Sequence, residues 1–146
     1  MEPKRRLPVL KAPMEEGSED PVRPPWQWVG FGTVAIFAVW LPLSWLATAV
    51  AARLGTTPGG QLAGVVLLAV SLGLSALAGG YLVGRWGAAG VGVREAALAG
   101  LSTALIAVAL AWRGGVLLEA LFSVVIAVPP AALGGRLGLR RRARGL

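Results

Sequence analysis

The chain has 146 residues, of which 55% are hydrophobic and 14% charged, and its mean hydropathy is +0.69. This balance is typical of a membrane protein rather than a soluble domain. Because histidine and cysteine are absent from the sequence, it offers no His-ligated haem, thiolate metal site, disulfide or Ser-His-Asp or cysteine nucleophile. We therefore expect no enzyme activity, no cofactor and no metal.

The first 25 residues form a segment of different composition from the rest. They contain six prolines, five basic and five acidic residues, and such a segment cannot bury enough apolar surface to offset its ordering entropy. We predict a charged arm over residues 1–25. The apolar run that follows, over residues 28–52, is too long for a secretory signal peptide, so we expect a spanning helix there and no cleavage.

Four stretches approach or reach the roughly 20 apolar residues that a membrane-spanning helix needs. They cover about residues 26–52, 62–84, 96–112 and 115–137. The sequence therefore predicts an all-α polytopic membrane protein, a bundle of four transmembrane helices over residues 26–137.

Prolines interrupt two of these stretches. Pro42 lies inside the first, where we expect a kink. Pro129 and Pro130 lie inside the fourth, and a helix that ended there would be only roughly 22 Å long, which is too short to span. We therefore expect the fourth helix to continue to about Leu137; in the alternative, the part after the prolines lies along the membrane interface.

Positive charge predicts the orientation. The arm, the turn over residues 85–95 and the segment after Leu133 together carry twelve Lys and Arg residues, against two in the other turns, Arg53 and Arg113. This bias places both termini in the cytoplasm, in a bacterial-type cytoplasmic membrane. Anionic lipid headgroups are the expected counter-charge for five arginines in particular: Arg85, Arg94, Arg140, Arg141 and Arg142. Nucleic acid is not expected as a partner, because no aromatic residues alternate with the basic ones of the arm or of the tail over residues 138–146.

Small residues recur every fourth position in the second and third helices. The rows are Ser71, Ser75 and Gly79; Gly80 and Gly84; Ala96, Gly100 and Ala104; and Ala99, Thr103, Ala107 and Ala111. Such rows let helices approach closely in lipid, and we expect them to pack within the bundle. The second helix ends AGGYLVGR and the fourth ends LGGRLGLR, which indicates either a tandem repeat of two helical hairpins or a coincidence of biased composition.

Glu119 is the carboxylate inside the fourth apolar stretch, about 7 Å from the predicted outer end of its helix. It shares a face with small residues, so we expect it to point toward a neighbouring helix. The residues of the first helix at similar depth that could contact it are Ser44, Trp45 and Thr48. Two interpretations remain, packing between helices or a place in a transport pathway. Trp40, in the middle of the first helix, faces lipid or packs beside Pro42, or else contacts another subunit.

These observations favour a non-enzymatic accessory or scaffold subunit of a larger membrane assembly, whose partners are membrane lipids and other membrane subunits. The alternative is a homo-oligomeric transporter or pore with Glu119 in the pathway, and a protein that forms membrane lesions is a third hypothesis.

Overall fold

The computed structural model describes residues 24–88, 90–112 and 117–145, with only the backbone described at 111 and 117–120. The predicted arm over residues 1–25 therefore lies outside the described residues, apart from its last two.

The described chain is all-helical. Its elements, in chain order, are α1 (Pro25–Arg53), α2 (Pro58–Trp86), α3 (Val93–Trp112) and α4 (Leu117–Ala143). Within the described residues, all four are long and apolar enough to cross a membrane, which indicates a protein integrated in a membrane.

The helices extend beyond the apolar stretches because local signals set their ends. α2 begins at Pro58, where proline suits the first helical position, and the Thr57 hydroxyl accepts a hydrogen bond from the Gly60 N–H at 3.2 Å. α4 continues through Pro129 and Pro130 and ends at Ala143. α1 likewise continues as one helix through Pro42.

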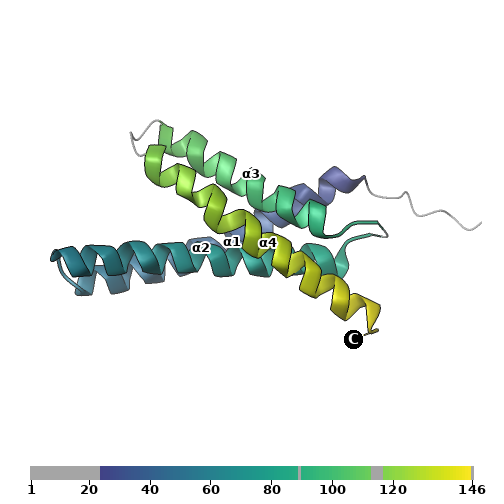
Figure 1. Ribbon diagram of the computed structural model, residues 1–146, viewed down its shortest axis with the longest axis horizontal. Helices are drawn as coiled ribbons and strands as arrows, with labels where there is room; N and C mark the ends of the chain where they lie inside the picture. Colours follow the sequence, from purple (N-terminus) through teal and green to yellow (C-terminus); the bar gives the residue numbers. More distant parts are fainter. Residues whose placement is uncertain (1–23, 89, 113–116, 146) are drawn as a thin grey trace, which may run out of the picture.

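α1 and α2 form one hairpin, and α3 and α4 form another (Figure 1). The hairpins cross where α2 and α4 end and diverge toward the two helix connections at the other side of the molecule (Figure 1). α1 packs against α2 and α3 and makes no contact with α4 among the described residues. The arrangement is therefore closed at one side and open at the other.

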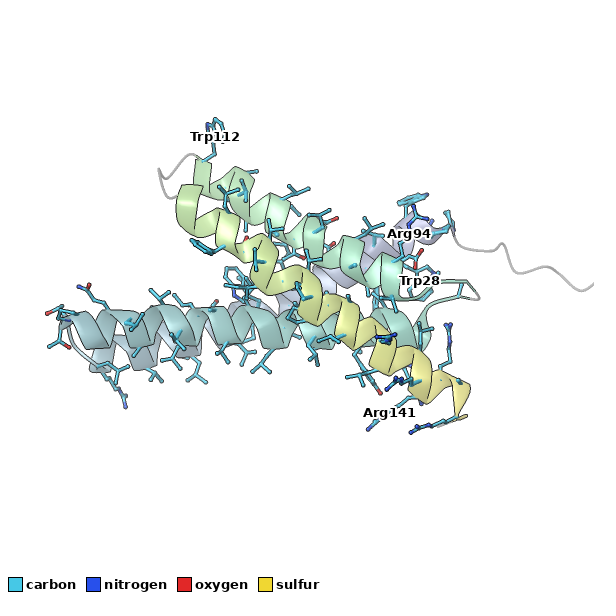
Figure 2. The ribbon with its side chains drawn as sticks, viewed as in Figure 1. Trp28, Arg94, Trp112 and Arg141 are labelled. Carbon is cyan, nitrogen blue, oxygen red and sulfur yellow. The ribbon has the colours of Figure 1, made fainter. Side chains whose placement is uncertain are left out.

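We call the closed side the basic end, because it carries the arginines at the end of α2, the start of α3 and the end of α4. They are Arg85, Arg94, Arg140, Arg141 and Arg142. We call the other side the loop end. Trp28 and Arg94 lie toward the basic end and Trp112 at the loop end (Figure 2), so indole rings are found near both ends of the helices, as expected for membrane interfaces.

Glycines make the crossing of α2 and α4 possible. A Cβ atom at Gly80 or Gly84 would collide with the backbone of Ala131 or Gly135 respectively. In return, a Cβ at Gly134 would collide with the backbone of α2 at Leu77. The two helices thus touch backbone to backbone, the contact that pairs of small residues four positions apart permit in membranes.

The buried core consists mainly of small side chains. The predicted rows are confirmed at ten positions, which are buried: Ser71, Ser75, Gly79, Gly80, Gly84, Ala96, Ala99, Gly100, Thr103 and Ala104. Ile36 and Val83 are the bulkiest fully buried side chains among the described residues. Packing therefore rests on close approach of helices rather than on large apolar residues.

Candidate functional site

The interior of the described bundle holds hydroxyl groups. The Ser75 hydroxyl donates to the Ser71 carbonyl at 2.6 Å, and the Thr103 hydroxyl donates to the Ala99 carbonyl at 2.9 Å. Thr33 donates to the Val29 carbonyl at 2.9 Å in the same way. These bonds lie within single helices, but the Thr33 hydroxyl also lies 3.4 Å from the Ala99 carbonyl of α3, to which it donates across the bundle, so a buried hydroxyl joins α1 to α3.

The described residues contain no cluster of side chains that could bind a metal ion. No group of three His, Cys, Asp or Glu side chains comes together there, and Glu95 is the one carboxylate whose side chain the structure describes. Glu95 accepts a hydrogen bond from the Gly92 N–H at 2.7 Å. This is the reach of a third-position glutamate back to the N-cap, which fixes the start of α3.

Glu119 belongs to α4, and its side chain lies outside the described residues. The three predicted neighbours lie on α1, away from α4. The Ser44 hydroxyl donates to the Leu41 carbonyl at 2.9 Å, and the Thr48 hydroxyl donates to the Ser44 carbonyl at 2.8 Å. Trp45 is 75% exposed. The described residues therefore do not bring this group together, and the contact with Glu119 stays a prediction.

Arg142 makes the most extensive polar contact at the basic end. Its guanidinium donates to the Gly87 carbonyl, to the Ala88 carbonyl at 3.4 Å and to the Val91 carbonyl at 3.3 Å. All three carbonyls belong to the connection between α2 and α3. The end of α4 is thereby attached to the two preceding helices by a planar donor group suited to several acceptors at once.

The other arginines of the basic end are more open. Arg141 is exposed, lies 5.9 Å from the centre of the Tyr81 ring and donates to the Tyr81 hydroxyl at 3.5 Å. Three exposed arginines are spaced every four residues along the end of the chain: Arg136 and Arg140 on α4, and Arg144 in the turn directly after it. This row, which we call the arginine row, could bind an anionic surface.

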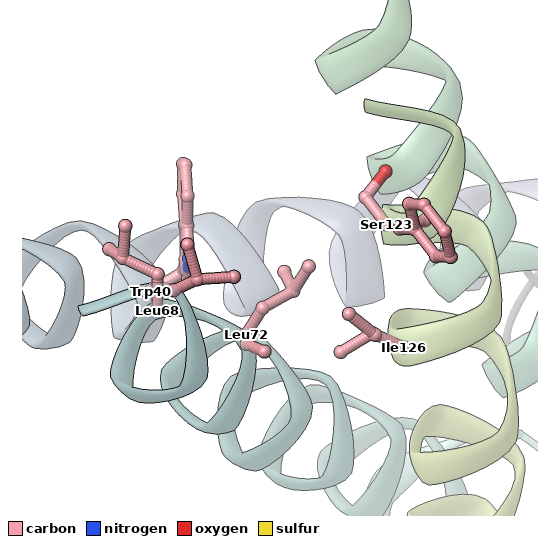
Figure 3. A pocket seen from close by; sticks show the side chains of 8 residues that line it. Trp40, Leu68, Leu72, Ser123 and Ile126 are labelled. Atoms are coloured by element: carbon pink, nitrogen blue, oxygen red, sulfur yellow. The ribbon is translucent and has the colours of Figure 1, made fainter. Parts of the chain in front are cut away.

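A cleft lies between the two hairpins (Figure 3). Its volume is about 590 Å³. It is lined by Trp40 of α1, by Val65, Leu68, Ala69 and Leu72 of α2, and by Phe122, Ser123 and Ile126 of α4. Trp40 and Leu68 lie on one side, and Ser123 and Ile126 lie across from them on α4 (Figure 3). The walls are almost wholly apolar, so this cleft suits a hydrocarbon ligand.

Trp40 is thus part of a cavity wall rather than a simple lipid-facing side chain. Its ring meets Phe37 edge to face with centres 6.1 Å apart. Its indole N–H is buried and has no hydrogen-bond partner in the structure. A buried indole N–H without a hydrogen-bond partner costs free energy of folding, because the group has lost its hydrogen bond to water.

Sequence reasoning did not identify the cleft or the contacts of Arg142. For Arg142 a signal was present, because Gly134, Gly138 and Arg142 are spaced by four and so share one helix face. That face carries the close contact with α2. For the cleft no signal existed, because apolar residues facing lipid and apolar residues facing a cavity look the same in a sequence.

Comparisons with protein-family models, with curated proteins and with solved structures give no match for this chain.

Proposed function

We propose that the protein is a non-enzymatic accessory or scaffold subunit of a larger membrane assembly, which it contacts through its basic end. The observation that carries this proposal is the construction of that end. Backbone contact between α2 and α4, the Glu95 cap and the Arg142 contacts hold three helix ends together, and the arginine row projects from this fixed base.

Charge complementarity favours an acidic partner surface. Of the described residues at the basic end, the acid is Glu95, and its carboxylate is used in the cap of α3. The arginine row therefore has no acidic partner within the described chain. An acidic segment of another subunit would neutralise this charge, and the regular spacing of the arginines would fix the alignment of that segment along α4. The predicted orientation places this contact on the cytoplasmic side of the membrane.

The described interior supports a scaffold more than a transporter. Its buried polar groups are uncharged, namely serine and threonine hydroxyls and the indole N–H groups of Trp28 and Trp40. In addition, α1 and α4 continue through their prolines as unbroken helices, whereas transporters often place sites at broken ones. The transport alternative depends on Glu119, whose side chain is not among those described.

Copurification in mild detergent is the test, with the full chain carrying a tag. We expect Arg140→Glu together with Arg144→Glu to reduce recovery of the associated subunits by about tenfold or more, because like charges face an acidic surface. The control is Arg53→Glu, which reverses one positive charge at the loop end and should leave recovery unchanged; Arg140→Glu alone, with the same change of charge, should already reduce it. Recovery of the chain alone from native membranes, or equal recovery with the double variant and with Arg53→Glu, would refute the proposal.

A further inference from the structure

The arginine row lies on the side of α4 that is turned away from the other helices. Gly134 and Gly135 face α2 and α3 respectively. At about 100° per residue, Arg136 and Arg140 follow these contacts around the helix and project outward, and both are exposed. The carboxylate of Glu95, the acid of the described basic end, is hydrogen-bonded in the cap of α3. The row therefore keeps its positive charge free for another group.

The start of α1 lies near the same end of α4, although these two helices make no described contact. Trp28 packs against the cluster that contains Val91 and Ala96. From α4, a Cβ at Gly135 would meet the Ala96 side chain at 2.6 Å, and Arg142 donates to the Val91 carbonyl. Because packed helix axes lie about 8–10 Å apart, α1 and α4, each packed on α3, are separated here by at most about 20 Å.

An acidic segment of this same chain directly precedes α1. Four of the seven acidic residues of the sequence lie within residues 15–20, with no basic residue among them: Glu15, Glu16, Glu19 and Asp20. Residues 21–24 alone separate Asp20 from Pro25, where α1 begins. Because an extended chain covers about 3.3–3.6 Å per residue, the four carboxylates can lie up to about 17–35 Å from Pro25. This reach includes the arginine row.

We infer that the acidic segment, residues 15–20, binds the arginine row of its own chain and so covers the surface that we propose for a partner subunit. The planar guanidinium groups pair with carboxylates through two hydrogen bonds at once. A short tether gives the segment an effective concentration in the millimolar range, which a partner must overcome. The contact within the chain stands independently of the proposed function, whereas the covering of the partner surface rests on it.

Anionic lipid headgroups are the competing occupant, because they carry the same sign of charge as the segment. The tether favours the segment, since a headgroup must be recruited from the membrane whereas residues 15–20 cannot leave. The start of α1 and the arginine row also lie at the same end of the described helices. The contact is therefore possible in either orientation of the protein in the membrane.

Two uncharged positions allow the contact to be measured without altering its charges. The chain has no native cysteine, Ser18 lies within the acidic segment, and exposed Ala143 lies between Arg140 and Arg144. The full chain with Ser18→Cys and Ala143→Cys is spin-labelled at both positions. It is then reconstituted in phosphatidylcholine vesicles that contain about a quarter phosphatidylglycerol, so that anionic headgroups compete. Pulsed electron paramagnetic resonance measures the distribution of distances between the labels.

We expect a narrow distribution, which broadens when the segment is neutralised by Glu15→Gln, Glu16→Gln, Glu19→Gln and Asp20→Asn. The matched control neutralises four charges of opposite sign in the same arm and should keep the distribution narrow: Lys4→Gln, Arg5→Gln, Arg6→Gln and Lys11→Gln. A broad distribution with the native segment would overturn the inference and, if it narrows without phosphatidylglycerol, would assign the row to lipid. An unchanged distribution after neutralisation would also overturn it. So would a narrow distribution between mixed, singly labelled chains, because it would place the segment on a second copy.

Copurification separates this inference from the proposed function. If the segment covers the partner surface, its neutralised variant should recover about threefold or more of the associated subunits relative to the wild-type chain, and the control variant should not. Equal recovery with the neutralised and native segments would overturn the covering and leave the proposed function standing. Recovery of no subunit with either would refute the proposed function and the covering with it, while the distance measurement would still decide the contact.

Discussion

Three consecutive arginines near the end of α4 have different surroundings. Arg140 and Arg141 are exposed, whereas Arg142 is half-buried and donates to three carbonyls of the connection between α2 and α3. The sequence predicts headgroup contacts for all three, since charge alone does not distinguish them. Their position around the helix does, because Arg142 follows the glycines that touch α2.

At this position we expect Arg142→Ala to destabilise the protein by about 1–3 kcal/mol, because carbonyls of the connection lose a charged donor. Thermal unfolding in detergent measures the loss, and hydrogen exchange at residues 87–92 should increase. Arg140→Ala is the control and should change stability by less than about 0.5 kcal/mol, because it is exposed. Similar effects of the two substitutions would show that the contacts of Arg142 contribute little.

The helices themselves could be predicted largely from apolar length, and their small-residue rows from spacing. What spacing does not supply is the register of the crossing. When the two similar segments are aligned in the sequence, Gly80 is equivalent to Gly135. In the structure, Gly80 of α2 contacts Ala131 of α4, and Gly134 of α4 contacts Leu77 of α2. The two contacts are three residues apart in each helix, so the packing makes Gly80 equivalent to Gly134 instead. Two adjacent glycines satisfy either alignment, and backbone contact selects one.

For these elements we expect Gly84→Ala to destabilise the crossing by about 1–3 kcal/mol, since its methyl group would collide with the Gly135 backbone. Gly30→Ala is the matched control in α1, where nothing lies within 4 Å of the added atom. It should be neutral, or stabilising by up to about 1 kcal/mol, because alanine favours a helix. Unfolding of both variants in the same detergent makes the comparison, and equal losses would mean that the close approach is not required.

On the scale of the whole molecule, the divergence of the hairpins could not be read from the sequence. In water an apolar face must be covered, so it indicates a neighbour, but in lipid an apolar face needs none. The predicted contact of Glu119 with α1 was based on depth along the helices, which places Glu119 level with Ser44, Trp45 and Thr48. Equal depth does not make two helices neighbours, and α1 and α4 make no contact among the described residues.

Orientation is a prediction at the same scale. In a chain without native cysteine, Arg140→Cys should be labelled by an impermeant reagent only after the cytoplasmic side is opened, and Thr56→Cys should be labelled from outside. Arg140 is preferred to Arg142 because its side chain is exposed. The opposite labelling pattern would invert the orientation and place the basic end outside.

The contact of Arg142 with the connection between α2 and α3 has a consequence for the order of biosynthesis. The carbonyls that accept hydrogen bonds from Arg142 are synthesised more than 50 residues earlier than Arg142 itself. Gly87, for example, precedes Arg142 by 55 residues. The glycine face of α2 likewise waits for α4. While the ribosome is still adding the fourth helix, the first three can be inserted but cannot be closed, and their small-residue groove is open to chaperones or to other nascent helices. Closure is therefore a late step of maturation, one that only the fourth helix completes.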